Sequence, residues 1–114
     1  ALDPRIRVAL NSCYLPDPHS ARDREIAWYA LDPAFDFSEW IALIAPRAYY
    51  METGETDDII PARDAPALVA QARQVYARLG LSDCYGYKNH PGWHEFDPAD
   101  DGIDFLVKHL MEVS

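Results

Sequence analysis

The segment AYYMETG, residues 48–54, decides the fold, because it has the composition of a buried β-strand and ends at a glycine turn. Short apolar runs of this kind are typical of strands that are covered on both faces. The runs IRVALNS (residues 6–12) and DCYGYKN (residues 83–89) have the same character, although Gly86 weakens the second. We therefore expect three strands, with residues 48–54 as the second along the chain.

Helical segments separate and follow these strands. The clearest covers residues 63–79, where apolar side chains repeat on one face and Gly80 stands at the position of a C-terminal cap. That face consists of Ala65, Leu68, Val69, Ala72, Val75, Tyr76 and Leu79. Residues 38–46 and 100–111 also show helical spacing: the first segment carries Trp40, Ile41 and Ile44 and stops at Pro46, and the second carries Ile103, Leu106, Val107, Leu110 and Met111. The alternation predicts an α/β fold with a parallel three-stranded sheet, flanking helices and right-handed crossovers.

Residues 16–36 do not fit this alternation. Prolines, mixed charges and aromatic side chains follow one another there without a clean period, so we expect an irregular insertion with one short helix around residues 22–30. Trp28 and Tyr29 lie in this insertion. They are expected either in the core or on the wall of a substrate pocket.

The composition excludes several classes of function. A chain of 114 residues with 49% hydrophobic residues has the size and apolar content of one globular domain. Its net charge of −9 argues against binding to nucleic acid or to an anionic membrane surface. Cys13 and Cys84 are far apart and lack metal-ligand spacing, so we expect free thiols. The start at Ala1, without a methionine, suggests a part of a longer protein.

Two polar segments follow predicted strands directly, GETDDIIP (residues 54–61) and NHPGWHEF (residues 89–96). In parallel sheets functional groups collect beyond the carboxyl ends of the strands, and neighbouring strands lie about 4.8 Å apart. Asp57 and His94 are therefore expected to meet. A carboxylate that accepts the imidazole N–H fixes the tautomer and stabilises the imidazolium, as a catalytic histidine requires.

The histidines also allow other interpretations. His90 and His94 are four residues apart, but Pro91 and Gly92 would break a helix that aligned them, and no H-E-x-x-H motif is present, so a zinc site is disfavoured. A plain polar turn is the remaining alternative. His90 is expected to be structural or solvated, and His19 and His109 are expected to be exposed.

The stretches ALDPRIRVALNSCYL, FSEWIALIAPRAYYMETGETDDIIPARDA and HPGWHEFDP resemble the C-terminal half of α/β-hydrolases of the acetyl-xylan-esterase and dienelactone-hydrolase type. The likeness covers most of the chain except residues 16–36. The G-x-x-D-x-x-x-P motif of that family falls on Gly54, Asp57 and Pro61, and its G-x-H-x-F motif falls on Gly92, His94 and Phe96. The resemblance implies that Asp57 is the triad acid, that Asp58 is its solvated neighbour, and that His94 is the triad base.

The sequence departs from the family at the nucleophile. No serine here has the G-x-S-x-G setting, and all five glycines lie at or after Gly54. Cys13 is a weaker candidate, because dienelactone hydrolases use cysteine but this one also lacks the glycine-flanked turn. The resemblance places the nucleophile and the oxyanion hole upstream of Ala1. It also implies that residues 48–54 form the middle strand, that the strands are the sixth to eighth of the fold, and that the chain alone is inactive.

The expected function is thus that of an esterase-type serine hydrolase acting on small-molecule or carbohydrate esters with acetyl-like acyl groups, without a metal or cofactor. The missing N-terminal half of the fold is the expected partner. A prolyl-oligopeptidase-like peptidase and a non-catalytic interaction module derived from the half-fold are the two alternatives.

Overall fold

The computed structural model describes residues 3–14, 37–59 and 62–112, and its centre is a parallel sheet. Strands β1 (Val8–Ser12), β2 (Ala48–Gly54) and β3 (Tyr85–His90) pair in the order β1-β2-β3, with Val8 opposite Ala48 and Tyr49 opposite Tyr85. The predicted α/β class, the parallel pairing and the middle position of residues 48–54 are confirmed.

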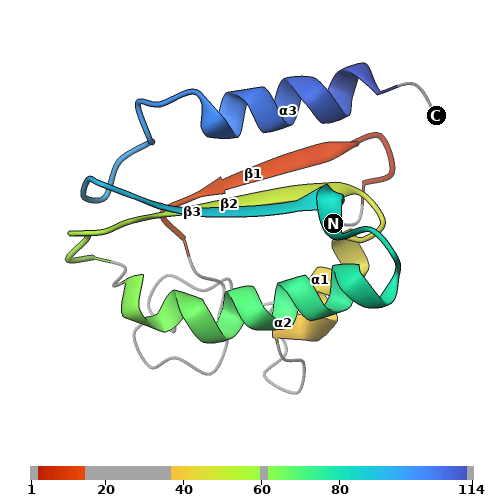
Figure 1. Ribbon diagram of the computed structural model, residues 1–114, viewed down its shortest axis with the longest axis horizontal. Coiled ribbons are helices and arrows are strands. Elements are labelled where there is room, and N and C mark those ends of the chain that lie inside the picture. Colours follow the sequence, from red (N-terminus) through yellow and green to blue (C-terminus); the bar gives the residue numbers. More distant parts are fainter. Residues whose placement is uncertain (1–2, 15–36, 60–61, 113–114) are drawn as a thin grey trace.

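Helices cover both faces of this sheet (Figure 1). Helices α1 (Phe37–Ile44) and α2 (Ala65–Arg78) lie on one face, and α3 (Asp101–Met111) lies on the other. Short 3₁₀ turns, Ala62–Asp64 and Ser82–Cys84, precede α2 and β3. The molecule therefore has three layers, with one helix layer on each side of the strands.

Strand β2 is the best-covered element, and all seven of its residues are buried. The main core lies between the sheet and the pair α1 and α2, and consists of Ile41, Tyr49, Met51, Ala65, Leu68, Val69, Ala72, Tyr76 and Tyr85. Tyr76 is fully buried and its hydroxyl donates to the Arg47 carbonyl at 2.6 Å, which satisfies the one polar atom it brings into the core. The apolar face predicted for residues 63–79 thus packs on the sheet.

Two expectations for the core were wrong. Leu79 is 54% exposed, because α2 ends at Arg78 and the chain turns away at Gly80, whose φ is 70°. The first strand is half-buried along its length instead of buried on both faces, and it begins at Val8. It is an edge strand of the described sheet, so only one side of it has a strand neighbour.

Helix α3 meets the sheet with a different face from the one its apolar pattern indicates. Gly102 allows this approach, since a Cβ atom there would lie 2.6 Å from Leu10 Cδ1. His109, expected to be exposed, is buried: its ring lies 4.3 Å from that of Phe105 between centroids, and its Nδ1 lies 3.2 Å from Glu112 Oε2. Side chains of the apolar stripe remain 44–74% exposed, namely Ile103, Val107, Leu110 and Met111.

Of the aromatic residues expected in the core or at a pocket, Trp40 is half-buried on α1. The helix expected at 22–30, with Trp28 and Tyr29, lies outside the described residues, and so does His19.

The two cysteines lie far apart. Cys13 follows the carboxyl end of β1 and Cys84 precedes the amino end of β3, so the two free thiols lie at opposite ends of the sheet. In the described part of the chain, no helix combines the length and apolar character that crossing a membrane requires.

Candidate active site

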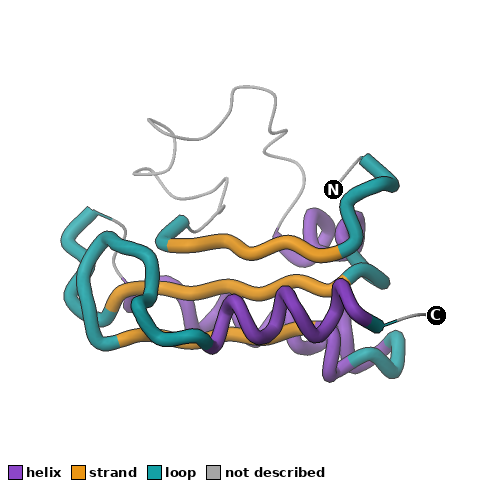
Figure 2. Tube along the Cα trace, turned by 90° about the horizontal axis from the view of Figure 1, so that it is seen from above, coloured by secondary structure: helices purple, strands orange, loops and turns teal. Residues whose placement is uncertain are grey.

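The loops that follow β2 and β3 lie side by side at the carboxyl end of the sheet (Figures 1 and 2). Backbone hydrogen bonds join them: Glu55 N–H donates to the His90 carbonyl and Thr56 N–H to the Gly92 carbonyl, each at 2.8 Å. Gly54 permits the crossing, because a Cβ atom at this position would lie 2.1 Å from the carbonyl oxygen of Trp93. The backbone itself therefore fixes the two loops against each other.

Asp57 is buried where these two loops meet. Its side chain is fully buried, its Oδ1 accepts the Ile59 N–H at 2.8 Å, and its Oδ2 lies 2.8 Å from His94 Nδ1. The hydrogen bond to Ile59 is a local turn that orients the carboxylate toward the neighbouring loop. Asp58 is exposed, as predicted.

The His94 ring has one protected and one accessible nitrogen. A carboxylate can only accept hydrogen bonds, so the short contact to Asp57 places a proton on Nδ1 and leaves Nε2 of the neutral ring with its lone pair. The side chain is 37% exposed, and no described residue bonds to Nε2. His94 is thus oriented on one side and open for proton transfer on the other.

His90 has a different environment. It is completely buried and its Nε2 donates to the Glu95 carbonyl at 3.0 Å, which ties the strand end to the far side of the loop. This is the structural role that the sequence suggested. The Nδ1 of His90 has no hydrogen-bond partner among the described residues.

A buried glutamate, which the sequence analysis did not single out, joins the site to the strand ends. Glu52 is 1% exposed, and its Oε1 accepts from Ser12 Oγ at 2.7 Å and from Asp97 N–H at 3.1 Å. One carboxylate oxygen thereby ties together β1, β2 and the segment after His94. The available signal was an acidic residue inside an otherwise apolar strand, since buried charges are rare unless they are paired.

Ion pairs between β3 and the segment after the histidine loop anchor the start of α3. Lys88 Nζ lies 2.8 Å from Asp97 Oδ2 and also pairs with Asp101. The hydrogen bond from Lys88 holds the pKa of the Asp97 carboxyl below its ordinary value, and the hydrogen bonds to Asp101 and Asp97 raise the pKa of Lys88. These charges stabilise the turn that returns the chain from His94 to the sheet.

Replacing Lys88 with methionine is expected to destabilise the protein in a pH-dependent way. Because the pKa of Asp97 is lower in the folded state, the pair contributes stability above about pH 4, the ordinary pKa of an unfolded aspartate, and this contribution is lost as pH falls through the lowered value. The loss in Lys88→Met should therefore be largest near neutral pH and shrink in acid. Urea unfolding at several pH values measures it.

Lys108→Met is the matched control, because Lys108 is an exposed lysine on α3. Its effect on the free energy of unfolding should be small and independent of pH. An equal loss for Lys88→Met at pH 3 and at pH 7 would show that the Lys88 charge does not act through a carboxylate.

Not every residue predicted for the site can be placed. The contact of Asp57 with His94 was predicted from strand order, and the structure brings the two side chains together. Pro61, the last residue of the acid motif, and the pocket candidates Trp28 and Tyr29 lie outside the described residues. Phe96, the last residue of the histidine motif, is 48% exposed.

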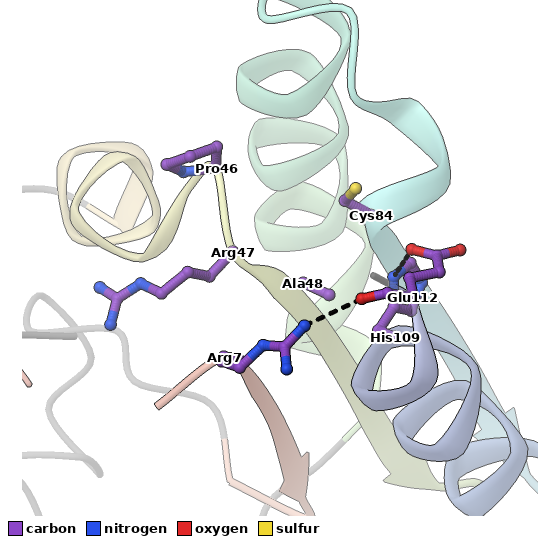
Figure 3. A pocket seen from close by; sticks show the side chains of 7 residues that line it. All are labelled: Arg7, Pro46, Arg47, Ala48, Cys84, His109 and Glu112. Carbon is purple, nitrogen blue, oxygen red and sulfur yellow. Dashed lines mark hydrogen bonds and ion pairs between the residues drawn. The ribbon is translucent and has the colours of Figure 1, made fainter. Parts of the chain in front are cut away.

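A separate hollow of about 410 Å³ lies at the amino ends of the strands (Figure 3). The side chain of Arg7 donates to the Glu112 carbonyl at 2.9 Å on its wall, and Cys84 and His109 also line it. Burial raises the pKa of the Cys84 thiol, which makes it a poor nucleophile. This hollow lies at the end of the sheet opposite Asp57 and His94 and shares no residue with their site.

No protein-family model, characterised protein or solved structure matches this chain. The geometry around Asp57 and His94 is therefore the basis on which a function can be proposed.

Proposed function

We propose that the chain is the C-terminal part of an α/β-hydrolase that cleaves carboxylic esters with small, acetyl-like acyl groups by a serine mechanism. Asp57 is the acid and His94 the base of its catalytic triad. The observation that carries this assignment is the 2.8 Å contact between Asp57 Oδ2 and His94 Nδ1, on adjacent loops at the carboxyl end of a parallel sheet.

The chemistry follows from the two ring nitrogens. The nucleophilic hydroxyl gives its proton to His94 Nε2 as its oxygen bonds to the ester carbonyl carbon and the carbonyl electrons move to oxygen. The collapsing intermediate expels the alkoxide, which takes the proton back from Nε2. Water then repeats the sequence on the acyl-enzyme and releases the acid. Buried Asp57 stabilises the imidazolium in both halves without accepting its proton.

The nucleophile in this proposal comes from a segment N-terminal to the chain. Among the described serines, Ser12 donates to Glu52, Ser38 lies in the first turn of α1, and Ser82 lies at the amino end of β3. None of them forms a hydrogen bond with His94. The thiol of Cys13 is buried and donates to the Glu95 carbonyl at 3.1 Å, so it is not exposed to an incoming substrate.

Two surfaces of the described structure fit an additional N-terminal half. The outer edge of β1 pairs with no other described strand, and α3 carries apolar side chains that remain exposed in the described structure. Both are the kinds of surface that further strands and helices cover in a larger α/β sheet. We place the N-terminal half of the fold against them.

The register of the acid loop is tested by two neighbouring substitutions in the protein that includes its upstream segment. Asp57→Asn should lower kcat for p-nitrophenyl acetate by roughly 10⁴-fold, because the amide favours the wrong imidazole tautomer. Asp58→Asn should change kcat by less than about twofold, since Asp58 is exposed. Peptide p-nitroanilides, assayed in parallel, distinguish an esterase from a peptidase.

Opposite effects of the two substitutions would move the triad acid to Asp58. A complete protein without turnover on either substrate class would instead favour a non-catalytic interaction module.

A further inference from the structure

The thiol of Cys13 lies in the candidate site but has no part in the proposed reaction. Cys13 follows β1 with a left-handed backbone, φ 57°, a conformation that residues other than glycine rarely adopt. Its N–H donates to the Glu52 carbonyl at 2.9 Å, so the turn is held by a strand-end hydrogen bond. The result is a buried thiol, 4% exposed, directed at the loop that carries His94.

The geometry points to a zinc site formed by Cys13, Asp57 and His94. The thiol sulfur, a carboxylate oxygen and an imidazole nitrogen of these residues all lie within 4.8 Å of one another. Tetrahedral Zn²⁺, with bonds of about 2.0 to 2.3 Å, holds its ligands about 3.3 to 3.8 Å apart. Side-chain movements of about 1 Å therefore close the site around an ion.

The donor set selects the kind of metal. One sulfur, one nitrogen and one oxygen suit borderline-soft Zn²⁺, whereas Mg²⁺ and Ca²⁺ prefer oxygen ligands alone. Binding releases one proton, from the Cys13 thiol, and the fourth position is left to water. The charge of the ion is then balanced by one thiolate and one carboxylate. A neutral assembly of this kind is compatible with the burial of Cys13 and Asp57.

The three ligands come from three strand ends that other contacts already fix. Cys13 follows β1, Asp57 follows β2, and His94 lies on the loop after β3. Glu52 ties the first and third of these segments together, and the backbone bonds across Gly54 tie the second to the third. Little ordering of the chain is therefore needed when the ion binds, which favours affinity.

Zinc bound in this position would inhibit the proposed hydrolase. The inhibition rests on the proposed function, whereas the binding of zinc does not. The ion takes the Asp57 carboxylate and a nitrogen of the His94 ring, so the pair is no longer available to move a proton. Inhibition of ester hydrolysis by Zn²⁺, reversed by a chelator, is the expected effect on the complete enzyme.

Binding is tested on the full chain with Co²⁺ as a spectroscopic probe in the presence of a phosphine reductant. Co²⁺ should produce a thiolate-to-cobalt charge-transfer absorption in the near ultraviolet, and equimolar Zn²⁺ should abolish it, because zinc binds such sites more tightly. Cys13→Ser should abolish the band. His94→Ala should weaken Zn²⁺ binding by at least tenfold in calorimetric titration.

Cys84→Ser is the matched control, because the second thiol lies at the other end of the sheet. It should leave the band and the affinity unchanged. A band that survives Cys13→Ser, disappears with Cys84→Ser, or never forms would overturn the site.

A second measurement uses the unmodified chain and so does not depend on a variant that folds. Zn²⁺ should protect Cys13 from alkylation by iodoacetamide at least tenfold, as read from peptide masses, and should leave the rate at Cys84 unchanged. Equal rates at Cys13 with and without zinc would contradict the inference. If zinc binds in both experiments but the complete protein hydrolyses no ester, the metal site stands and the hydrolase assignment falls.

Discussion

His94→Ala is expected to lower kcat for ester hydrolysis by roughly 10⁶-fold in the protein that includes the upstream nucleophile, with little change in KM. The reason is the position of Nε2: no described residue bonds to it, and Asp57 holds the proton on the other nitrogen. Removing the ring leaves the nucleophile without a base and the leaving alkoxide without an acid. Steady-state rates with p-nitrophenyl acetate and the acylation rate in a single turnover measure the loss.

Loss of folding has to be separated from loss of chemistry in this variant. Alanine at position 94 leaves the buried Asp57 carboxylate with its Ile59 hydrogen bond but without the imidazole, which costs about 1–3 kcal/mol of stability. Circular dichroism and the melting temperature should therefore show a folded, less stable protein at the assay temperature. A His94→Ala protein with wild-type turnover would eliminate the triad assignment.

Gly54→Ala is expected to have the largest effect among substitutions outside the triad. The added Cβ would lie 2.1 Å from the Trp93 carbonyl oxygen and 2.7 Å from its carbonyl carbon, and both are backbone atoms that cannot rotate away. The loop must move as a unit, which shifts His94 relative to the nucleophile. We expect a loss of about 1–3 kcal/mol in stability and of about 10²-fold in kcat.

Gly86→Ala separates the two effects. A Cβ atom there would meet a side-chain atom, Tyr50 Cδ2, at 2.7 Å, on the strand and away from the His94 loop. This variant should lose stability while kcat stays within about twofold of wild type. If Gly54→Ala and Gly86→Ala lower kcat equally, the contact between Gly54 and Trp93 does not position His94.

Several properties of the protein follow from the sequence alone because they depend on local patterns. The bounds of β2, residues 48–54, and the interior of α2 are readable from an apolar run and from a helical period that glycines terminate. The meeting of Asp57 with His94 was also predictable, since parallel strands bring their carboxyl ends to one edge whatever the details of packing. Residue type and strand order were sufficient for these statements.

Other properties were decided only by the tertiary structure, because they depend on which face of an element meets its neighbour. Helix α3 turns Gly102 and His109 toward the sheet and leaves most of its apolar stripe outside, since the small glycine permits a close approach that hydrophobicity does not encode. Glu52 joins β1 to the segment beyond His94 through contacts about 40 residues apart in sequence. The proximity of Cys13 to Asp57 and His94 also depends on the tertiary structure. The turn after β1 directs the Cys13 thiol at a loop 80 residues away. Backbone geometry sets this direction, and no periodic pattern in the sequence indicates it.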